Sequence, residues 1–489
     1  MRRGRQVRHN ILTCTNSDIM GFISTFTWKK GIVKFGDDFR KAASYPWFQG
    51  VLLMGCVVAA MLLANLPFTK ELYHNLLEAK VQIRFLTGNG TDIHFPKDMT
   101  VEKLINDILM VVFFFTVGLE IRREIAHGEL SSPKKAMLPV IAAFGGVMAP
   151  ACIYALINSG TAAASGWGIP TATDIAFVVC ILTMLGDKVP VSIKVFLTAL
   201  AIADDLIAIL VVAIFYGGSI NLGQLGISLL VILAAMMLKK VGEKRILPYM
   251  ICAVMVWILF YYSGVHATMS GVVMAFLIPA EPRYSKYQYI RKRDRLLVKL
   301  AKYDNPDPAD FPNAMQKDCL RRLEAVANGS MDMSYRVERF LSPWVNYLIM
   351  PIFALANAGV VISDASYFNI FKFDPALGSV SMGIFLGLLI GKPVGITLFS
   401  WIATKLKLGE MPTGANWSKL FAAACLGGIG FTMSIFVDTL SFGGNSPEVM
   451  MQLRNAGKIA ILLASVSAGV FGSIMVNIAD AAGKRHIKK

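Results

Sequence analysis

Long apolar stretches recur along the whole chain, and they constrain its fold more than any other feature. Of the 489 residues, 55% are hydrophobic and 16% are charged, whereas soluble domains carry about 25% charged residues. A backbone that crosses a bilayer must satisfy its own hydrogen bonds, and a run of about 20 apolar residues does so as an α-helix. The sequence therefore predicts an all-α integral membrane protein.

Twelve apolar runs are long enough, or nearly long enough, to span a bilayer. They lie at about 48–66, 104–121, 136–157, 169–186, 191–216, 225–238, 247–264, 266–280, 344–362, 378–404, 420–442 and 456–479. We therefore expect twelve transmembrane helices. An even number of spans places both ends of the chain on one side of the membrane.

Lysine and arginine mark the segments expected on that side. They crowd both chain ends and the loops 122–135 and 239–245, while the loops 158–168 and 217–224 contain none. Loops rich in these residues stay in the cytoplasm, so both termini are expected to be cytoplasmic. The net charge of +16 then reports these loops, and no nucleic-acid partner is indicated. The expected organisation is a basic N-terminal tail 1–47, spans 1–8 in 48–280, an extended basic cytoplasmic loop 281–343, spans 9–12 in 344–479, and a basic tail 480–489.

One outside loop differs from the others. Residues 81–95 alternate in polarity around Gly88, Asn89 and Gly90, as a β-hairpin does. An exposed hairpin offers unpaired backbone groups to a second copy. We therefore expect an external β-hairpin at about 81–95 and a homodimer formed through it.

Two adjacent carboxylates, Asp204 and Asp205, lie inside the apolar run from Val191 to Tyr216. A carboxylate at such depth costs about 2.5–3.5 kcal/mol on insertion scales, so ionisable residues there usually serve ion or proton transfer. Burial and a like-charged neighbour both disfavour ionisation, and hard oxygen ligands suit Na⁺ or Li⁺. The pair is thus expected to hold either protons or a metal cation. A pair that only hydrates a crevice is the plainer alternative.

Three further ionisable groups lie within or beside apolar spans: Asp107, Asp174 and Lys392. We expect Lys392 to pair with one of the two aspartates, most readily Asp204, because a buried acid and a buried base attract each other. An arriving cation or proton can displace the ammonium. A permanent salt bridge that fixes helix packing is the alternative, and the two roles are compatible.

Segments 4 and 11 are short apolar runs interrupted by Pro, Thr or Gly, at IPTATD and at CLGGIGFTMS. Such paired interruptions are typical of inverted-repeat transporters with discontinuous helices. Half-helix ends in the membrane carry partial charges, positive at N-termini and negative at C-termini. Asp174 can balance the former and Lys392 the latter, although Asp174 also fits an ordinary helix cap.

Six stretches resemble the bacterial NhaA sodium/proton antiporters, in order along the chain: TATDIAF, LTALAIADDLIAI, SGVHATMSGV, FALANAGV, LLIGKPVGI and GGIGFTMSIF. The resemblance runs from about residue 45 to 480. It implies twelve helices in inverted-topology repeats, with segments 4 and 11 broken and crossed. It also implies electrogenic exchange of Na⁺ or Li⁺ for protons without a cofactor, serving salt tolerance and pH homeostasis.

The resemblance also assigns roles to residues. Asp205 matches the principal cation ligand, Asp204 the proton-carrying partner of Lys392, and Thr173 with Asp174 the polar groups at the first break. Six more positions match residues linked to the cytoplasmic funnel, to pH response or to the family pattern in general: Asp107, Glu120, Arg123, Glu124, His266 and Glu338. From the sequence alone, charges at a helix end are more often caps or topology signals, and a lone histidine is more often structural.

Two departures from the family pattern affect regulation. Arg339 and Ser342 stand where histidines are expected beside Glu338, and neither residue titrates near neutrality. The loop 281–343 is also longer than the family pattern. The pH profile of activation and the role of this loop are therefore open.

Other function classes fit the sequence less well. An intramembrane aspartyl protease needs GxGD, which is absent, and an ATP-driven pump needs GxxxxGK[ST], which is also absent. The seven cysteines show no metal-ligand spacing. A sodium-coupled solute symporter is the nearest rival, because it also uses broken helices. We expect a secondary antiporter and not an enzyme.

Overall fold

The computed structural model describes most of the chain beyond the N-terminal tail. The described residues are 45–81, 83–86, 92–95, 99–217, 221–302, 313–362, 369–371, 373–375, 377–412, 414–442 and 447–487. The expected N-terminal tail therefore lies outside them up to residue 44, as do the turn 87–91 of the expected hairpin and the last two residues.

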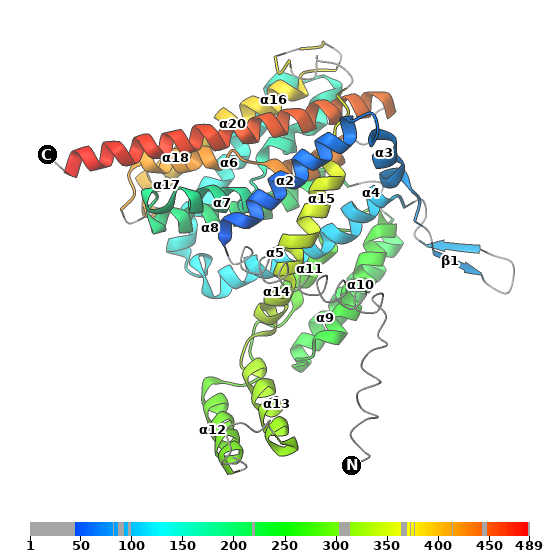
Figure 1. Ribbon diagram of the computed structural model, residues 1–489, viewed down its shortest axis with the longest axis vertical. Helices are drawn as coiled ribbons and strands as arrows, with labels where there is room; N and C mark the ends of the chain where they lie inside the picture. Colours follow the sequence, from blue (N-terminus) through cyan, green and yellow to red (C-terminus); the bar gives the residue numbers. More distant parts are fainter. Residues whose placement is uncertain are drawn as a thin grey trace, which may run out of the picture.

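Helices form nearly all of the described structure (Figure 1). The first half contains α2 (Pro46–Asn65), α3 (Lys70–Glu78), α4 (Val101–Leu104), α5 (Met110–His127), α6 (Pro133–Asn158), the 3-10 helix η3 (Ala162–Thr171), α7 (Ile175–Met184), α8 (Val191–Phe215), α9 (Leu222–Val241) and α10 (Ile246–Ser263). The second half contains α11 (Met269–Leu277), α12 (Lys286–Lys302), α13 (Ala314–Gly329), α14 (Met333–Trp344), α15 (Met350–Asn357), α16 (Val380–Leu386), α17 (Lys392–Lys405), α18 (Trp417–Leu426), α19 (Phe431–Ser441) and α20 (Pro447–Ile487). Short π-helical turns join α4 to α5, α14 to α15 and α16 to α17, so each pair forms one continuous helical segment.

Within the described ranges, nine helices are long and apolar enough to cross a membrane. Two bent pairs, η3 with α7 and α18 with α19, raise this number to eleven if each pair is one span. The remaining run of the expected twelve, 266–280, contains only the nine-residue α11. The chain is a multi-pass membrane protein, as its hydropathy predicted.

Helix α2 shows how these spans face two apolar environments. Leu53, Val57 and Ala60 are buried in the protein, while Met54 and Val58 are exposed on its surface. Both faces are equally apolar because lipid tails cover one and neighbouring helices the other. The helix therefore shows almost no amphipathic pattern in its sequence.

Helix boundaries differ from the hydropathy runs at two places. The ninth span runs from Met333 to Asn357, so its first turns lie inside the stretch that was expected to be soluble loop. These turns are amphipathic, and the face that carries Met333 and Val337 is buried, with α5 among the helices packed on α14. The last helix, α20, runs from Pro447 to Ile487, past both ends of its apolar run, because a helix continues beyond the hydrocarbon layer.

Two peripheral features stand apart from the bundle. Helices α12 and α13 pack on each other and project from one end of the molecule (Figure 1). Strands β1 (Ile83–Leu86) and β2 (Asp92–Phe95) pair antiparallel, with Ile83 opposite Phe95 and Leu86 opposite Asp92. This two-stranded sheet extends away from the helices at the right of Figure 1, whereas α12 and α13 project at the bottom.

Helices α6 and α17 approach each other through glycines. A Cβ at Gly395 would lie 2.1 Å from the carbonyl oxygen of Gly145, and a Cβ at Gly145 would lie 2.5 Å from that of Gly395. Small residues at helix crossings allow close van der Waals packing, which holds helices together in membranes. This contact fixes α17, which carries Lys392, against α6.

The first prediction concerns this crossing. We expect Gly395→Ala to destabilise the protein by about 1–3 kcal/mol, because the added methyl forces two backbones apart. The thermal midpoint of the purified protein in detergent measures this loss. Gly55→Ala on α2 is the matched control, since a Cβ there meets nothing within 4 Å. Equal midpoints for the two variants would contradict the close approach.

Candidate functional site

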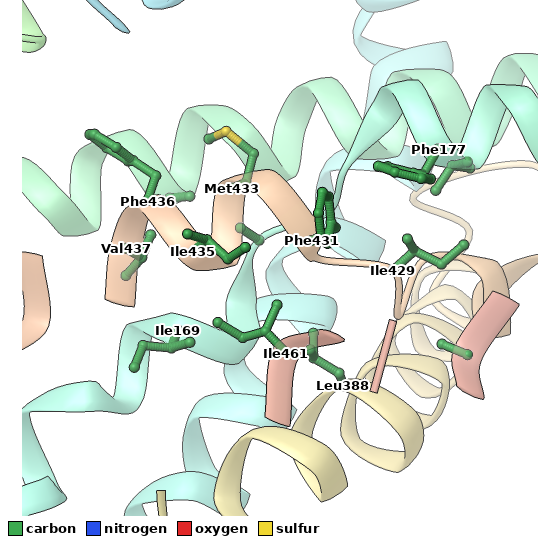
Figure 2. Packing of buried hydrophobic residues seen from close by; sticks show 14 of the residues in the cluster. Ile169, Phe177, Leu388, Ile429, Phe431, Met433, Ile435, Phe436, Val437 and Ile461 are labelled. Atoms are coloured by element: carbon green, nitrogen blue, oxygen red, sulfur yellow. The ribbon is translucent and has the colours of Figure 1, made fainter. Parts of the chain in front are cut away.

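The two broken spans meet at their interruptions. The backbone N–H of Asp174 donates to the carbonyl of Ile429 at 2.7 Å, so the first break pairs with the second. Apolar side chains enclose this meeting point: Phe177 and Phe431 pack edge to face with ring centroids 4.9 Å apart, and Leu388 and Ile461 lie nearby (Figure 2). The backbone groups freed by each break are thus bonded and shielded from lipid, which a membrane requires.

Asp174 faces the N-termini of two half-helices. Its carboxylate caps α7 by accepting from the N–H groups of Ala176 at 3.1 Å and Phe177 at 3.3 Å. The same carboxylate accepts from the N–H of Thr432 at 3.0 Å and from the Thr432 hydroxyl, at the start of α19. Helix N-termini carry partial positive charge, and these four donors account for the burial of Asp174.

Lys392 contacts both Asp204 and the C-terminal end of η3. Its Nζ lies 3.0 Å from Asp204 Oδ2 and donates to the carbonyl of Thr171 at 2.6 Å. Thr171 ends the half-helix η3, where the helix carries partial negative charge. Both Lys392 and Asp204 are fully buried, so the ammonium offsets a carboxylate and a helix C-terminus together.

Thr173 ties the same carboxylate to the second break. Its hydroxyl lies 2.7 Å from Asp204 Oδ2 and 3.1 Å from the carbonyl of Gly427. A hydroxyl has one proton, so Thr173 donates to one of these two oxygens at a time. The hydrogen bond from Thr173 to Asp204 can therefore be exchanged for one to the carbonyl of Gly427 when the hydroxyl rotates.

The two central carboxylates keep oxygens free. Asp205 is 2% exposed, and no described residue donates to Asp204 Oδ1 or to Asp205 Oδ1. A buried carboxylate oxygen without a donor costs free energy. It lowers that cost by binding a proton or a cation. The geometry thus offers unsatisfied oxygen ligands next to a displaceable ammonium.

A second charged cluster joins α5 to α14. Arg123 contacts Glu338 directly, and its Nη2 lies 3.4 Å from Glu124 and 3.7 Å from Glu120. Glu338 is buried, and its Oε2 accepts from no described residue. Three of the six accessory residues thus surround the guanidinium of a fourth, Arg123.

The other two accessory residues lie elsewhere. Asp107 sits on the π-helical turn Ile105–Leu109, where its carbonyl accepts from the Trp257 indole at 3.3 Å. In the described part of the chain, it makes no hydrogen bond to the central groups. His266 Nε2 contacts the carbonyl of Tyr216, which links the stretch before α11 to the end of α8.

Comparison with known proteins places the chain in a family. The family model described as Na⁺/H⁺ antiporter 1 matches residues 40–476. The chain belongs to the Na⁺/H⁺ antiporter 1 family. The other members compared are 38–40% identical to it.

Three relatives illustrate the match. The Na⁺/H⁺ antiporter NhaA 2 of Syntrophotalea carbinolica is 38% identical over 91% of this chain and 97% of its own. The antiporters NhaA of Oleidesulfovibrio alaskensis and Sulfurimonas denitrificans are each 40% identical, over 90% and 91% of this chain and 93% and 96% of theirs. Among solved structures, the sodium proton antiporter MjNhaP1 from Methanocaldococcus jannaschii has 10% identity and a TM-score of 0.49, covering 94% of this chain and 98% of its own. The family assignment rests on the family model and the sequence relatives.

Sequence reasoning missed two members of the polar network in this antiporter family chain. Thr432 closes the cap around Asp174, and the carbonyl of Thr171 receives Lys392. Thr432 follows the glycine-rich break directly, so its position at a helix start was a usable signal. A backbone carbonyl leaves no signal in the sequence.

Ser342 and Arg339, the two residues expected to depart from the family pattern, do not contact the Glu338 carboxylate in the described structure. Ser342 donates its hydroxyl to the carbonyl of Glu338 at 2.8 Å. Arg339 is exposed. The charges facing Glu338 therefore come from α5 and not from its own helix.

Proposed function

We propose that this antiporter family member exports Na⁺ or Li⁺ in exchange for protons at Asp204 and Asp205. The observation that carries the proposal is the Lys392–Asp204 pair at 3.0 Å, beside carboxylate oxygens without donors. In the cation-free state Lys392 holds Asp204. An arriving cation is bound principally by Asp205, and Asp204 turns from the ammonium toward it.

Protons compete for the same oxygens. A protonated carboxyl is neutral and no longer attracts a metal cation, so each carboxylate is occupied by one or the other. Because two carboxylates can carry two protons while sharing one monovalent cation, a cycle moves net charge. We therefore propose that the exchange is electrogenic and uses the proton gradient to remove sodium.

Alternating access completes the mechanism. The half-helix ends at the two breaks are held by Asp174, Thr173 and Lys392. Loss of the Lys392–Asp204 attraction on ion binding changes the relative energy of the two packings. We infer twelve helices in two inverted-topology repeats with the broken spans crossed, since broken spans of this kind accompany that architecture.

Accessory groups and location complete the proposal. The Arg123 cluster of Glu120, Glu124 and Glu338 lies in the last turns of α5 and the first turns of the span that begins with α14. Protonation there can alter entry to the site, with Asp107 and His266 as further contributors. Both termini are cytoplasmic, and the protein lies in a bacterial inner membrane. No cofactor takes part in the exchange. Two copies of the chain form a homodimer through β1 and β2. Salt tolerance and pH homeostasis are the expected roles. Family membership does not favour a sodium-coupled solute symporter.

The decisive measurement is cation-driven proton movement by the purified wild-type protein in proteoliposomes. A pH gradient is preset, and dye dequenching is followed after addition of Na⁺, Li⁺ or K⁺. The assay is repeated at pH values from about 6 to 9, the range in which ionisable groups with shifted pKa values gain or lose protons. We expect dequenching with Na⁺ or Li⁺ and none with K⁺. Failure with every cation would reject the proposal.

A further inference from the structure

A third buried carboxylate, Asp438, lies on α19 away from the central site. Its exposure is 0%, and no described residue donates a hydrogen bond to either of its oxygens. It follows Phe436 and Val437, which pack in the apolar core (Figure 2). Counted from Phe431 at the break, it lies about 10 Å further along the helix axis.

Two cations of α20 flank this carboxylate. Arg454 and Lys458 are four residues apart and therefore lie on one face of α20. Both positive charges act on Asp438. Arg454 donates a hydrogen bond to the carbonyl of Thr439, the residue after Asp438. The cations thus offset part of the cost of burying the negative charge, while no described residue donates a hydrogen bond to the carboxylate oxygens.

Gly457 explains how the carboxylate reaches α20. A Cβ at this position would lie 2.1 Å from Asp438 Oδ1. Asp438 therefore rests directly against the backbone of α20 at Gly457, which precedes Lys458 and lies three residues after Arg454. A carboxylate that only filled space would not need this approach.

Other ionisable groups face the same cluster. Tyr154 on α6 and Tyr216 at the end of α8 lie within electrostatic range of Asp438. Glu102 on α4 lies within electrostatic range of Lys458. Helices η3 and α15 also pack on α19, and neither contains a titratable residue. The carbonyl of Tyr216 contacts His266, so this cluster adjoins one of the accessory residues.

We propose that Asp438 is a proton-relay residue on the outer side of the Asp204–Asp205 site. It binds a proton that enters from the outside as an O–H bond and releases it toward the central carboxylates, while Lys458 and Arg454 stabilise the ionised form between turns. Two neighbouring cations repel Na⁺, so the site selects protons over the metal. This proposal rests on the proposed exchange and on the topology that places the end of α19 outside.

Two fluxes in proteoliposomes separate a relay from a structural charge. One is proton movement driven by Na⁺, and the other is exchange of radioactive Na⁺ against unlabelled Na⁺, which needs no proton transfer. For Asp438→Asn we expect the first rate to fall by about tenfold or more, as loss of an acid–base group does, while most of the second is retained. A parallel fall of both, or no change in either, would overturn the relay.

A second variant keeps the test valid if Asp438→Asn is poorly folded. Asp438→Asn with Lys458→Gln removes both charges, so a purely structural pair would regain proton flux. A relay residue would leave that flux low in a protein whose thermal midpoint has recovered. Glu448→Gln, an exposed charge change on α20, is the matched control and should behave as wild type. If wild type itself shows no Na⁺-driven flux, the proposed function fails, which is distinct from failure of the relay.

Discussion

Replacing Asp205 with asparagine should abolish Na⁺- and Li⁺-driven proton movement, with a fall of at least about 100-fold in rate. Asparagine keeps the size of the side chain but cannot be ionised, so it offers neither a charge for the cation nor a site for the transported proton. The measurement is dye dequenching in proteoliposomes across the pH range used for wild type.

The design of this experiment separates loss of the site from loss of the protein. Asp318→Asn is the matched control, because the Asp318 side chain on α13 is 45% exposed and its ion pair among the described residues is with Arg322 one turn away. That variant should transport at the wild-type rate. A fully active Asp205→Asn would show that the cation binds elsewhere, whereas a purified, monodisperse but inactive variant supports the assigned role.

Replacing Lys392 with methionine should destabilise the protein by about 3–5 kcal/mol, the usual cost of removing one partner from a buried ion pair. Asp204 would then be left fully buried with an uncompensated charge, and the carbonyl of Thr171 would lose its donor. The thermal midpoint in detergent should fall steeply. Protonation of Asp204 relieves part of the cost, so the defect should shrink as the pH is lowered.

A double variant distinguishes structure from transport at this pair. Asp204→Asn with Lys392→Met removes both charges, and apolar or neutral replacements of a buried pair are often nearly neutral for stability. We expect its thermal midpoint to recover while Na⁺-driven proton movement stays absent. Recovery of transport together with stability would show that the pair only fixes helix packing.

Much of the fold could be predicted because the bilayer imposes strong local rules. Backbone groups in lipid must be bonded within a helix, so spans such as 191–216 and 136–157 appear as apolar runs and were located to within a few residues. Helix ends outside the hydrocarbon obey no such rule. For this reason the start of α14 at Met333 and the full length of α20 were not predicted.

The chemical groups of the site were also visible in the sequence, because an ionisable residue in an apolar run is conspicuous. Asp204, Asp205, Asp174 and Lys392 all stand out in this way, and the expected contact of Lys392 with Asp204 is present at 3.0 Å. Asp438 was overlooked, although it lies inside the run 420–442. The sequence analysis did not single it out from the other residues of that run.

The sequence by itself determined that the chain crosses the membrane many times, where two segments break and which ionisable groups they carry, since each of these depends on neighbours along the chain. Only the tertiary structure decided which groups meet. Lys392 reaches Thr171 across 221 residues, and Thr173 reaches Gly427 across 254. Such contacts depend on how helices pack, through close approaches such as Gly145 with Gly395, and packing distances are not encoded in any local pattern.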